Sequence, residues 1–328
     1  NTSGATNTAV GSSSLENNTT GSNNVGFGTG TLTANTTGNN NVAIGNSVLD
    51  ASQTAGNNTA VGHESMTTNT SGGSNVAVGY QSLREQTTGS NNTGIGFQAV
   101  YSNTTANNNT GIGYNALLLN TTGGDNTAVG AHALDSNTTA NFNCAFGQAA
   151  LAANTTGPRN SSFGQGSLRA NTTGGQNVAI GYISMDSNTT SSGNVAVGAY
   201  TLQAQTDGTG QNTAIGDSVM YSNTSGSNNV AVGHRALNAN TTASDNTAVG
   251  DNALTANTTG HSNVAVGTNS LDANTTGQRN TALGFNALTT ATTNDNTAVG
   301  ARSLLLNTSG AQNVAVGSQA ADANTTGS

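Results

Sequence analysis

The sequence predicts an all-β fold, a parallel β-solenoid (β-roll) of about 19 coils with about 17 residues per coil. Three observations favour it. A pentad of Asn, a variable residue, a small residue, a large apolar residue and Gly recurs along the whole chain. Its spacing is close to constant, and fixed-period self-similarity is typical of repeat architectures. Charged residues make up only 6% of the chain, against about 25% in ordinary domains.

The repeat has the consensus N-[TV]-A-[VI]-G-x-x-[AS]-L-x-[AS]-N-T-T-G-x-x, in which we number the first Asn as position 1. The coil that starts at Asn194 is longer than the consensus by a single residue, and the coil that starts at Asn280 is shorter by one. We expect residues 1–328 to form a single repetitive domain, a segment of a longer fibre protein. The coils begin at residues 7, 24, 41, 58, 75, 92, 109, 126, 143, 160, 177, 194, 212, 229, 246, 263, 280, 296 and 313.

Positions 1 and 5 are invariant, as Asn and Gly. Stacked coils place equivalent residues about 4.8 Å apart, at which spacing Asn side chains bond to the copies above and below. An invariant Gly indicates positive φ or a place where no side chain fits. We therefore predict a structural ladder, exemplified by Asn41, Asn58, Asn75, Asn92, Gly45, Gly62, Gly79 and Gly96.

The large apolar residues predict which side chains face the core. Position 4 is always large and apolar, and position 9 is Leu, Met or Val in all coils but the last. Since residues two apart on a strand share a face, we expect positions 2 and 4 to point inward together, from strands at positions 1–5 and 7–11. Cys144, at position 2, is then a small core residue. No charge falls at positions 1–5 or 9, which agrees with this assignment.

Position 3 should then point away from the core, yet it is Ala in fifteen coils, Gly in three and Ser in one. A solvent-facing position would vary more in size. Two explanations are open: close packing against another chain, or against a flattened turn of the same chain. The first is favoured, and the candidate chain–chain contacts include Ala43, Ala60, Ala77 and Ala128.

Composition argues against several functions. The net charge of −8, with no basic stripe, disfavours nucleic acid, and no run of 18 apolar residues predicts membrane insertion. The four histidines lie in different coils, so we expect none to meet a carboxylate or cysteine, and no enzyme activity. Asp does not recur in every coil, as calcium-filled β-rolls require. No cofactor or metal is expected.

The pentads Asn41–Gly45 (NVAIG) and Asn75–Gly79 (NVAVG) resemble the head repeats of trimeric autotransporter adhesins of the YadA type, and similar repeats in phage and viral tail fibres. The resemblance covers nearly the whole chain. It implies a left-handed roll, three chains side by side, and an extracellular place on a cell surface, a secreted filament or a virion. The repeat here is longer than the adhesin-head period, and no stalk or anchor sequence is present.

Three surface features are candidate sites. The tract N-T-[TS] at positions 12–14 is an N-glycosylation sequon in fifteen coils, which include Asn35, Asn69, Asn103, Asn154 and Asn223. A turn explains the same residues, and Asn side chains about 4.8 Å apart leave no room for a glycan on each. Three consecutive coils carry an aromatic residue at position 6, which offers a surface platform for a sugar or a self-stacking ladder: Tyr80, Phe97 and Tyr114.

The sequence thus favours a structural extracellular fibre or filament shaft of the adhesin or tail-fibre type, a rigid spacer for surface attachment. Self-association is expected, as a homotrimer or an end-to-end filament. The alternative is a solenoid whose Thr-rich turns bind ice, a glycan or a host receptor. Ice binding needs outward Thr at alternate positions, whereas the Thr pairs here are adjacent.

Overall fold

The computed structural model describes residues 2–327 and confirms the all-β parallel solenoid. Every coil contributes one short strand, at positions 2–4. Each turn of the solenoid uses about 17 residues, as the step from Asn41 to Asn58 illustrates. The described residues contain no helix. The chain divides into two compact units, Asn1–Asn160 and Ser161–Ser328, each built from the same coil.

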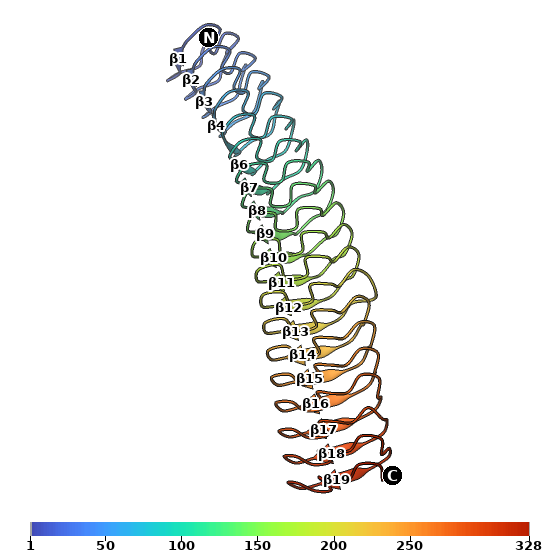
Figure 1. Cartoon of the computed structure of the whole chain (residues 1–328). Helices are drawn as coiled ribbons and strands as arrows, with labels where there is room; N and C mark the ends of the chain where they lie inside the picture. The colour runs from blue at the N-terminus through green and yellow to red at the C-terminus, as the bar shows by residue number, and fades with distance from the viewer. Residues whose placement is uncertain (1, 328) are drawn as a thin grey trace. The chain divides into compact units, whose positions relative to one another are not determined.

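The first unit holds nine strands, which lie one after another along its coils (Figure 1). Neighbours pair in parallel and in register, so that equal positions are partners; Val42 pairs with Thr59, for example. The strands are β1 (Thr8–Val10), β2 (Val25–Phe27), β3 (Val42–Ile44), β4 (Thr59–Val61), β5 (Val76–Val78), β6 (Thr93–Ile95), β7 (Thr110–Ile112), β8 (Thr127–Val129) and β9 (Cys144–Phe146).

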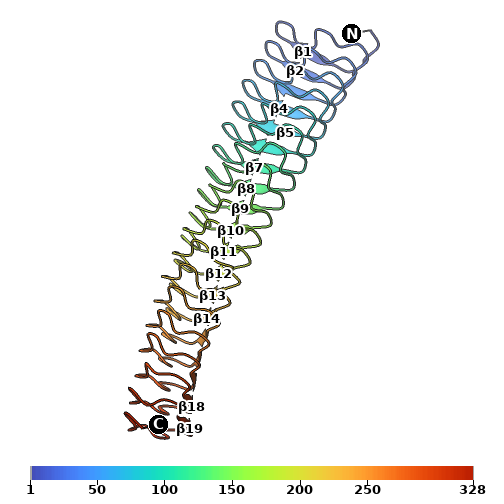
Figure 2. The same cartoon turned by 90° about the vertical axis from the view of Figure 1, so that its right-hand side faces the viewer.

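The second unit repeats this pattern with ten strands, which the turned view shows in the same succession (Figure 2). The longer coil and the shorter coil both keep the register: Val195 pairs with Thr213, and Thr281 with Thr297. The strands are β10 (Ser161–Phe163), β11 (Val178–Ile180), β12 (Val195–Val197), β13 (Thr213–Ile215), β14 (Val230–Val232), β15 (Thr247–Val249), β16 (Val264–Val266), β17 (Thr281–Leu283), β18 (Thr297–Val299) and β19 (Val314–Val316).

The prediction of a second strand in each coil, at positions 7–11, is wrong. Positions 7 and 9 have positive φ, as at Ser47 (+54°) and Leu49 (+50°), so the backbone turns there. The turn interrupts the alternation of an extended chain, and the adjacent positions 8 and 9 are both buried, as Val48 and Leu49 are. Leu is strained in this region, which indicates that stacking holds it there.

The core lies on the opposite face of the strand from the one the sequence predicted. Position 3 is fully buried, whereas positions 2 and 4 are partly or largely exposed, as the strand Val42–Ile44 illustrates. Positions 1, 3, 8, 9, 12 and 15 fill each interior coil. The predicted inward placement of positions 2 and 4 is therefore wrong.

The narrow interior explains this inversion. A Cβ on Gly26, at position 3, would lie 2.4 Å from Ser14 Oγ and 3.7 Å from Leu15 Cγ. Position 3 thus packs directly on positions 8 and 9 of the same chain, and only a small side chain fits. The predicted chain–chain contacts are wrong for that reason: Ala43, Ala60, Ala77 and Ala128 are fully buried within their own coils.

Candidate functional surface

Two internal amide ladders hold the coils together. At position 1, Asn41 Oδ1 accepts the backbone N–H of Asn58 at 3.0 Å, and Asn58 Oδ1 accepts that of Asn75 at 2.9 Å. Asn75 Oδ1 continues the series to Asn92 at 2.9 Å. The Nδ2 groups donate across the coil to the position-15 carbonyl, as from Asn58 to Gly72 at 2.9 Å. The ladder residues predicted at position 1 therefore bond mainly to backbone groups.

The glycines of position 5 lie where successive coils meet most closely. Their φ angles run from +120° to +140°, a region that essentially only Gly adopts. A Cβ at Gly45 would approach the carbonyl oxygen of Gly62 to 2.3 Å, and the same holds for Gly62 over Gly79. A Cβ built on Gly79 or on Gly96 would likewise lie 2.3 or 2.4 Å from the carbonyl oxygen of the next position-5 glycine. Both conformation and space therefore exclude a side chain.

Of the two explanations of the sequons, glycosylation is contradicted for the folded coil, because position 12 is buried and forms the second internal ladder. Asn35 Nδ2 donates to Asn18 Oδ1 at 2.8 Å and to the carbonyl of Gly38 at 3.2 Å. The amide nitrogen that a glycan would occupy is thus already bonded inside the coil. The five example sequons, Asn35, Asn69, Asn103, Asn154 and Asn223, are all fully buried.

The Thr residues of positions 13 and 14, which follow the Asn of position 12, differ in their hydrogen bonding and exposure. At position 13 the hydroxyl completes a third ladder, as Thr87 Oγ1 donates to the carbonyl of Thr104 at 3.1 Å and Thr104 Oγ1 to that of Thr121 at 3.2 Å. At position 14 the side chains are exposed, for example Thr88 and Thr122. The turns thus present one row of exposed Thr and hold the other row in coil–coil bonds.

We define the outer face as the side chains of positions 2 and 4, which point away from the core of each unit. Position 4 is apolar in every coil, and its larger side chains are exposed: Phe27 by 55%, Ile112 by 37% and Ile215 by 40%. Neither position carries a charge in any of the nineteen coils. All 20 charged residues of the chain lie at other positions, so this face combines exposure with the composition of a contact surface.

Cys144 lies on this outer face and is partly exposed. The prediction that it is a core residue is wrong, for the same reason as for the rest of position 2. Loss of hydration raises the pKa of its thiol above the ordinary value. The thiol is accordingly a weak nucleophile at neutral pH.

The three predicted aromatic residues form a stack. The ring centroids of Tyr80 and Phe97 are 5.2 Å apart at 12° between planes, and those of Phe97 and Tyr114 are 5.1 Å apart at 11°. His63 extends the stack at 5.6 Å, and His132 meets Tyr114 edge-on at 5.2 Å. We call these five residues the aromatic ladder. It occupies position 6, except for His132 at position 7.

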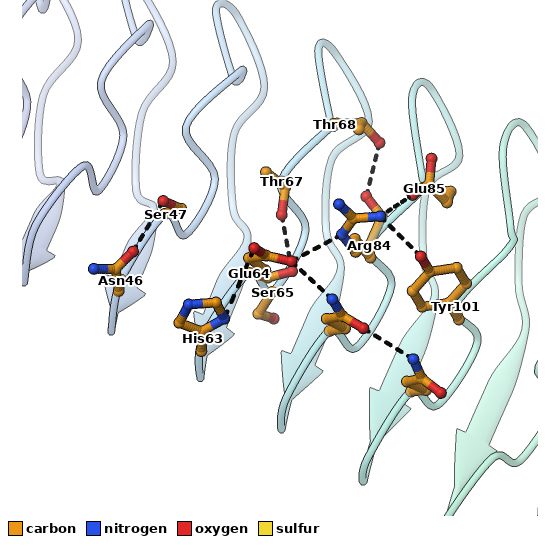
Figure 3. Close-up of polar contacts among 12 residues, drawn as sticks. Asn46, Ser47, His63, Glu64, Ser65, Thr67, Thr68, Arg84, Glu85 and Tyr101 are labelled. Atoms are coloured by element: carbon orange, nitrogen blue, oxygen red, sulfur yellow. Dashed lines mark hydrogen bonds and ion pairs between the residues drawn. The ribbon is translucent and has the colours of Figure 1, made fainter.

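One charged cluster lies in the same coils but at positions 7, 10 and 11. Arg84 contacts Glu64 at 3.1 Å (Nε to Oε2), Glu85 at 2.6 Å (Nη1 to Oε1) and the Tyr101 hydroxyl at 2.8 Å (Figure 3). The hydrogen bond from Gln81 and the charge of Arg84 hold the pKa of Glu64 below its usual value. The cluster is an ion-pair network in which one guanidinium bridges two carboxylates.

Histidines meet carboxylates more often than expected. His132 Nδ1 lies 3.2 Å from Asp135 Oδ2 and His234 Nδ1 lies 2.9 Å from Asp251 Oδ1, so the prediction that no histidine meets a carboxylate is wrong. Coil stacking brings equal positions of successive coils together, as it does for His234 and Asp251. Among residues 2–327, no group of three or more His, Cys, Asp or Glu side chains is placed to hold a metal ion.

No pocket opens between the described residues. Within the described residues, no helix is long and apolar enough to cross a membrane. No protein-family model matches the chain, and no curated protein matches it in sequence. The candidate functional surface is therefore identified from geometry alone, and it consists of the outer face with the aromatic ladder beside it.

Proposed function

We propose that this chain is a non-enzymatic structural segment of an extracellular fibre, of the adhesin-shaft or tail-fibre type, whose copies associate side by side through the outer face. The chain acts as a rigid spacer that holds an attachment site away from a cell or virion surface. The resemblance of its pentads to adhesin-head repeats supports the extracellular place and a homotrimer.

The ladders support the mechanical part. Strand pairing and the position-1 amide ladder join coil to coil, and the position-12 amide ladder and the Thr ladder of position 13 add to them along most of the chain. Repeat proteins of this kind draw their stability from contacts between neighbouring coils. Many weak bonds then act in parallel against bending and against local opening.

The outer face is the observation that carries the self-association. Position 4 is apolar in every coil and partly or largely exposed, position 2 is partly exposed and holds Val, Thr, Ser or Cys, and no charge interrupts either row in nineteen coils. Soluble monomers rarely expose contiguous apolar patches beyond a few hundred Å², and larger patches mark interaction sites. Inner alanines cannot serve in this role because their own coil buries them.

Mass per length tests the proposal. Each coil of this chain, which has nineteen coils and a mass of 32.2 kDa, adds about 4.8 Å along the solenoid. We expect sedimentation to find two or three chains per particle, and electron microscopy to find two or three times the mass of one coil in each coil step. The mass of a single chain at micromolar concentration would contradict side-by-side association.

A further inference from the structure

The aromatic ladder widens the outer face over five consecutive coils. Each ring of the ladder follows a position-4 residue after one intervening Gly, as in Ile95-Gly96-Phe97 and Ile112-Gly113-Tyr114. The residues of both rows are exposed, Ile95 by 38%, Phe97 by 40% and Tyr114 by 50%. The result is a local apolar strip, broader than the outer face alone.

The ring faces of this strip are already occupied. From His63 to Tyr114 the planes lie within 12° of one another at centroid distances of 5.1–5.6 Å, so the central rings cover each other's faces. A sugar binds aromatic residues by stacking on a ring face, and the ladder leaves ring edges outward instead. The edges suit aliphatic side chains or the edges and faces of other rings.

Carboxylates come near the strip at its two ends, where His63 Nδ1 lies 4.0 Å from Glu64 and His132 Nδ1 lies 3.2 Å from Asp135. The other charged residues of the same coils, Arg84, Glu85 and Asp125, lie at positions 10, 11 and 17.

Position 6 is acidic or basic elsewhere in the chain, since it holds Asp217, His234 and Asp251 in three later coils. Position 6 is also aromatic at Tyr182 and Phe285, but there in single coils. The run of rings in successive coils is therefore a local feature, and it distinguishes one axial level from another.

A partner that contacts every ring of the ladder must present groups at the same spacing, coil after coil. A second copy of this chain does so by construction. We infer that the aromatic ladder sets the axial register of the contact between two copies, which lie parallel with their ladders at the same level. The inference rests on the proposed self-association, and it adds the level at which the copies meet.

The parallel arrangement follows from matching the whole outer face. A rotation axis along the coils places equal positions of both chains at equal levels in every coil. A shift by one coil leaves one of the five ladder levels unmatched at each end, whereas position 4, which is Val or Ile in fifteen of nineteen coils, tolerates most shifts. The ladder therefore supplies a register that the outer face lacks.

Cys144 is a native reporter of this register. It lies on the outer face, in the coil directly after the one that holds His132, and the chain contains no other cysteine. In parallel copies at the same level the two thiols lie at one level. In copies related by a two-fold axis across Phe97, six coil steps, about 29 Å, separate them.

The experiment is cross-linking of the full chain with a bis-maleimide that spans about 8 Å, at about pH 8.5 because the thiol pKa is raised. We expect covalent dimers from the wild type. The triple variant Tyr80→Ser, Phe97→Ser, Tyr114→Ser should lose most of this cross-link and associate about tenfold or more weakly in sedimentation. The double variant Tyr80→Phe, Tyr114→Phe keeps the rings and should behave as the wild type.

Leu119→Ser is the matched control. Leu119 is equally exposed, by 47%, but lies at position 11 in the same coils, and its loss should change neither readout. Circular dichroism of each variant verifies folding. If the wild type is monomeric, the proposed self-association fails, and this inference with it. If the wild type associates but gives no cross-link, or if the triple variant cross-links equally well, the register inference alone is overturned.

Discussion

Individual residues in this coil are fixed by what lies in the next coil. The glycine of position 5 is the clearest case, since both its φ and the carbonyl above it exclude a Cβ. The small residue of position 3 is fixed in the same way by positions 8 and 9. Each residue packs against the equivalent or nearby residues of the adjacent coils, and this packing explains why the repeat is maintained along the chain.

Gly62→Ala should destabilise the first unit. The new Cβ would lie 2.3 Å from the carbonyl oxygen of Gly79, and φ is +136°. We expect a loss of about 2–4 kcal/mol in the free energy of unfolding, from strain and displaced coil–coil bonds. Chemical denaturation measures it.

Gly30→Asn is the control for that substitution. Gly30 has φ of +65° and only ordinary contacts beyond 3.7 Å, and Asn occupies the same position with φ of +53° at Asn115. An effect below about 0.5 kcal/mol is expected, because Asn tolerates this conformation. A loss as large as that of Gly62→Ala would show that any side chain in these turns is disruptive.

Asp50 and Asp272 should make the folded chain more stable at acid pH than at neutral pH, because burial raises the pKa of both carboxyls. A raised folded-state pKa means that protonation favours the folded state, so this stability is full below the unfolded pKa and is lost as pH rises through the folded pKa. At pH 7 both groups are charged and unfavourable.

Asp50→Asn and Asp272→Asn test that reasoning. We expect each to raise the free energy of unfolding at pH 7 by a small amount, up to about 0.5 kcal/mol, since half-exposed charges are screened by solvent. The gain should vanish at about pH 3, where the wild-type carboxyls are protonated. Chemical denaturation across this pH range provides the measurement, and a gain that is independent of pH would contradict the burial argument.

At the scale of one element, the coil depends on uninterrupted ladders. The position-12 ladder is broken where Ser52 replaces Asn, and there the buried atoms Asn35 Oδ1 and Ser52 Oγ have no hydrogen-bond partner. A buried polar atom without a partner costs about 1–3 kcal/mol. The coil that starts at Asn41 is therefore a weak point of the first unit.

Ser52→Asn should repair this ladder. Its Nδ2 would reach Asn35 Oδ1, as Asn120 Nδ2 reaches Asn103 Oδ1 at 3.1 Å in an intact stretch. We expect stabilisation of about 1 kcal/mol. The reverse change, Asn120→Ser, should cost about 1–3 kcal/mol, because it removes that bond and the one to the Gly123 carbonyl. Equal effects of the two substitutions, in sign and size, would refute the ladder argument.

For the whole molecule, association through the outer face should resist salt. Positions 2 and 4 hold no charge, so screening removes no attraction between copies. We expect sedimentation to show the same assembly, or a tighter one, when NaCl rises from about 0.05 to 1 M. Dissociation by salt would point to the charged positions 7, 10 and 11 instead.

Thermal hysteresis separates the proposal from the ice-binding alternative. The hydroxyls of position 13 bond to neighbouring coils, position 14 presents one exposed Thr row, and the partly exposed Thr of position 2 is replaced by Val, Ser or Cys in ten of the nineteen coils. An ice-binding face needs at least two regular rows in one plane. We therefore expect no hysteresis at millimolar concentration, and measurable hysteresis would favour the Thr-rich turns as a binding site.

The sequence by itself determined the coil. Its period, the invariant Asn and Gly and the absence of charge at positions 1–5 predicted a stacked parallel solenoid with internal ladders. The physical reason is that stacking identical coils places each residue next to the equivalent residues of the adjacent coils. The same period also placed Tyr80, Phe97 and Tyr114 in neighbouring coils.

Only the tertiary structure decided which face of the strand is the inside. Alternation with a period of two is symmetric between two faces, and assigning the larger residues to the core was wrong here. The interior is too narrow for them: position 3 packs on Ser14 and Leu15, so small residues lie inside and Val, Ile and Phe lie outside. That inversion moved Cys144 to the surface, buried the sequons, and moved the proposed contact between copies from the alanines of position 3 to the outer face.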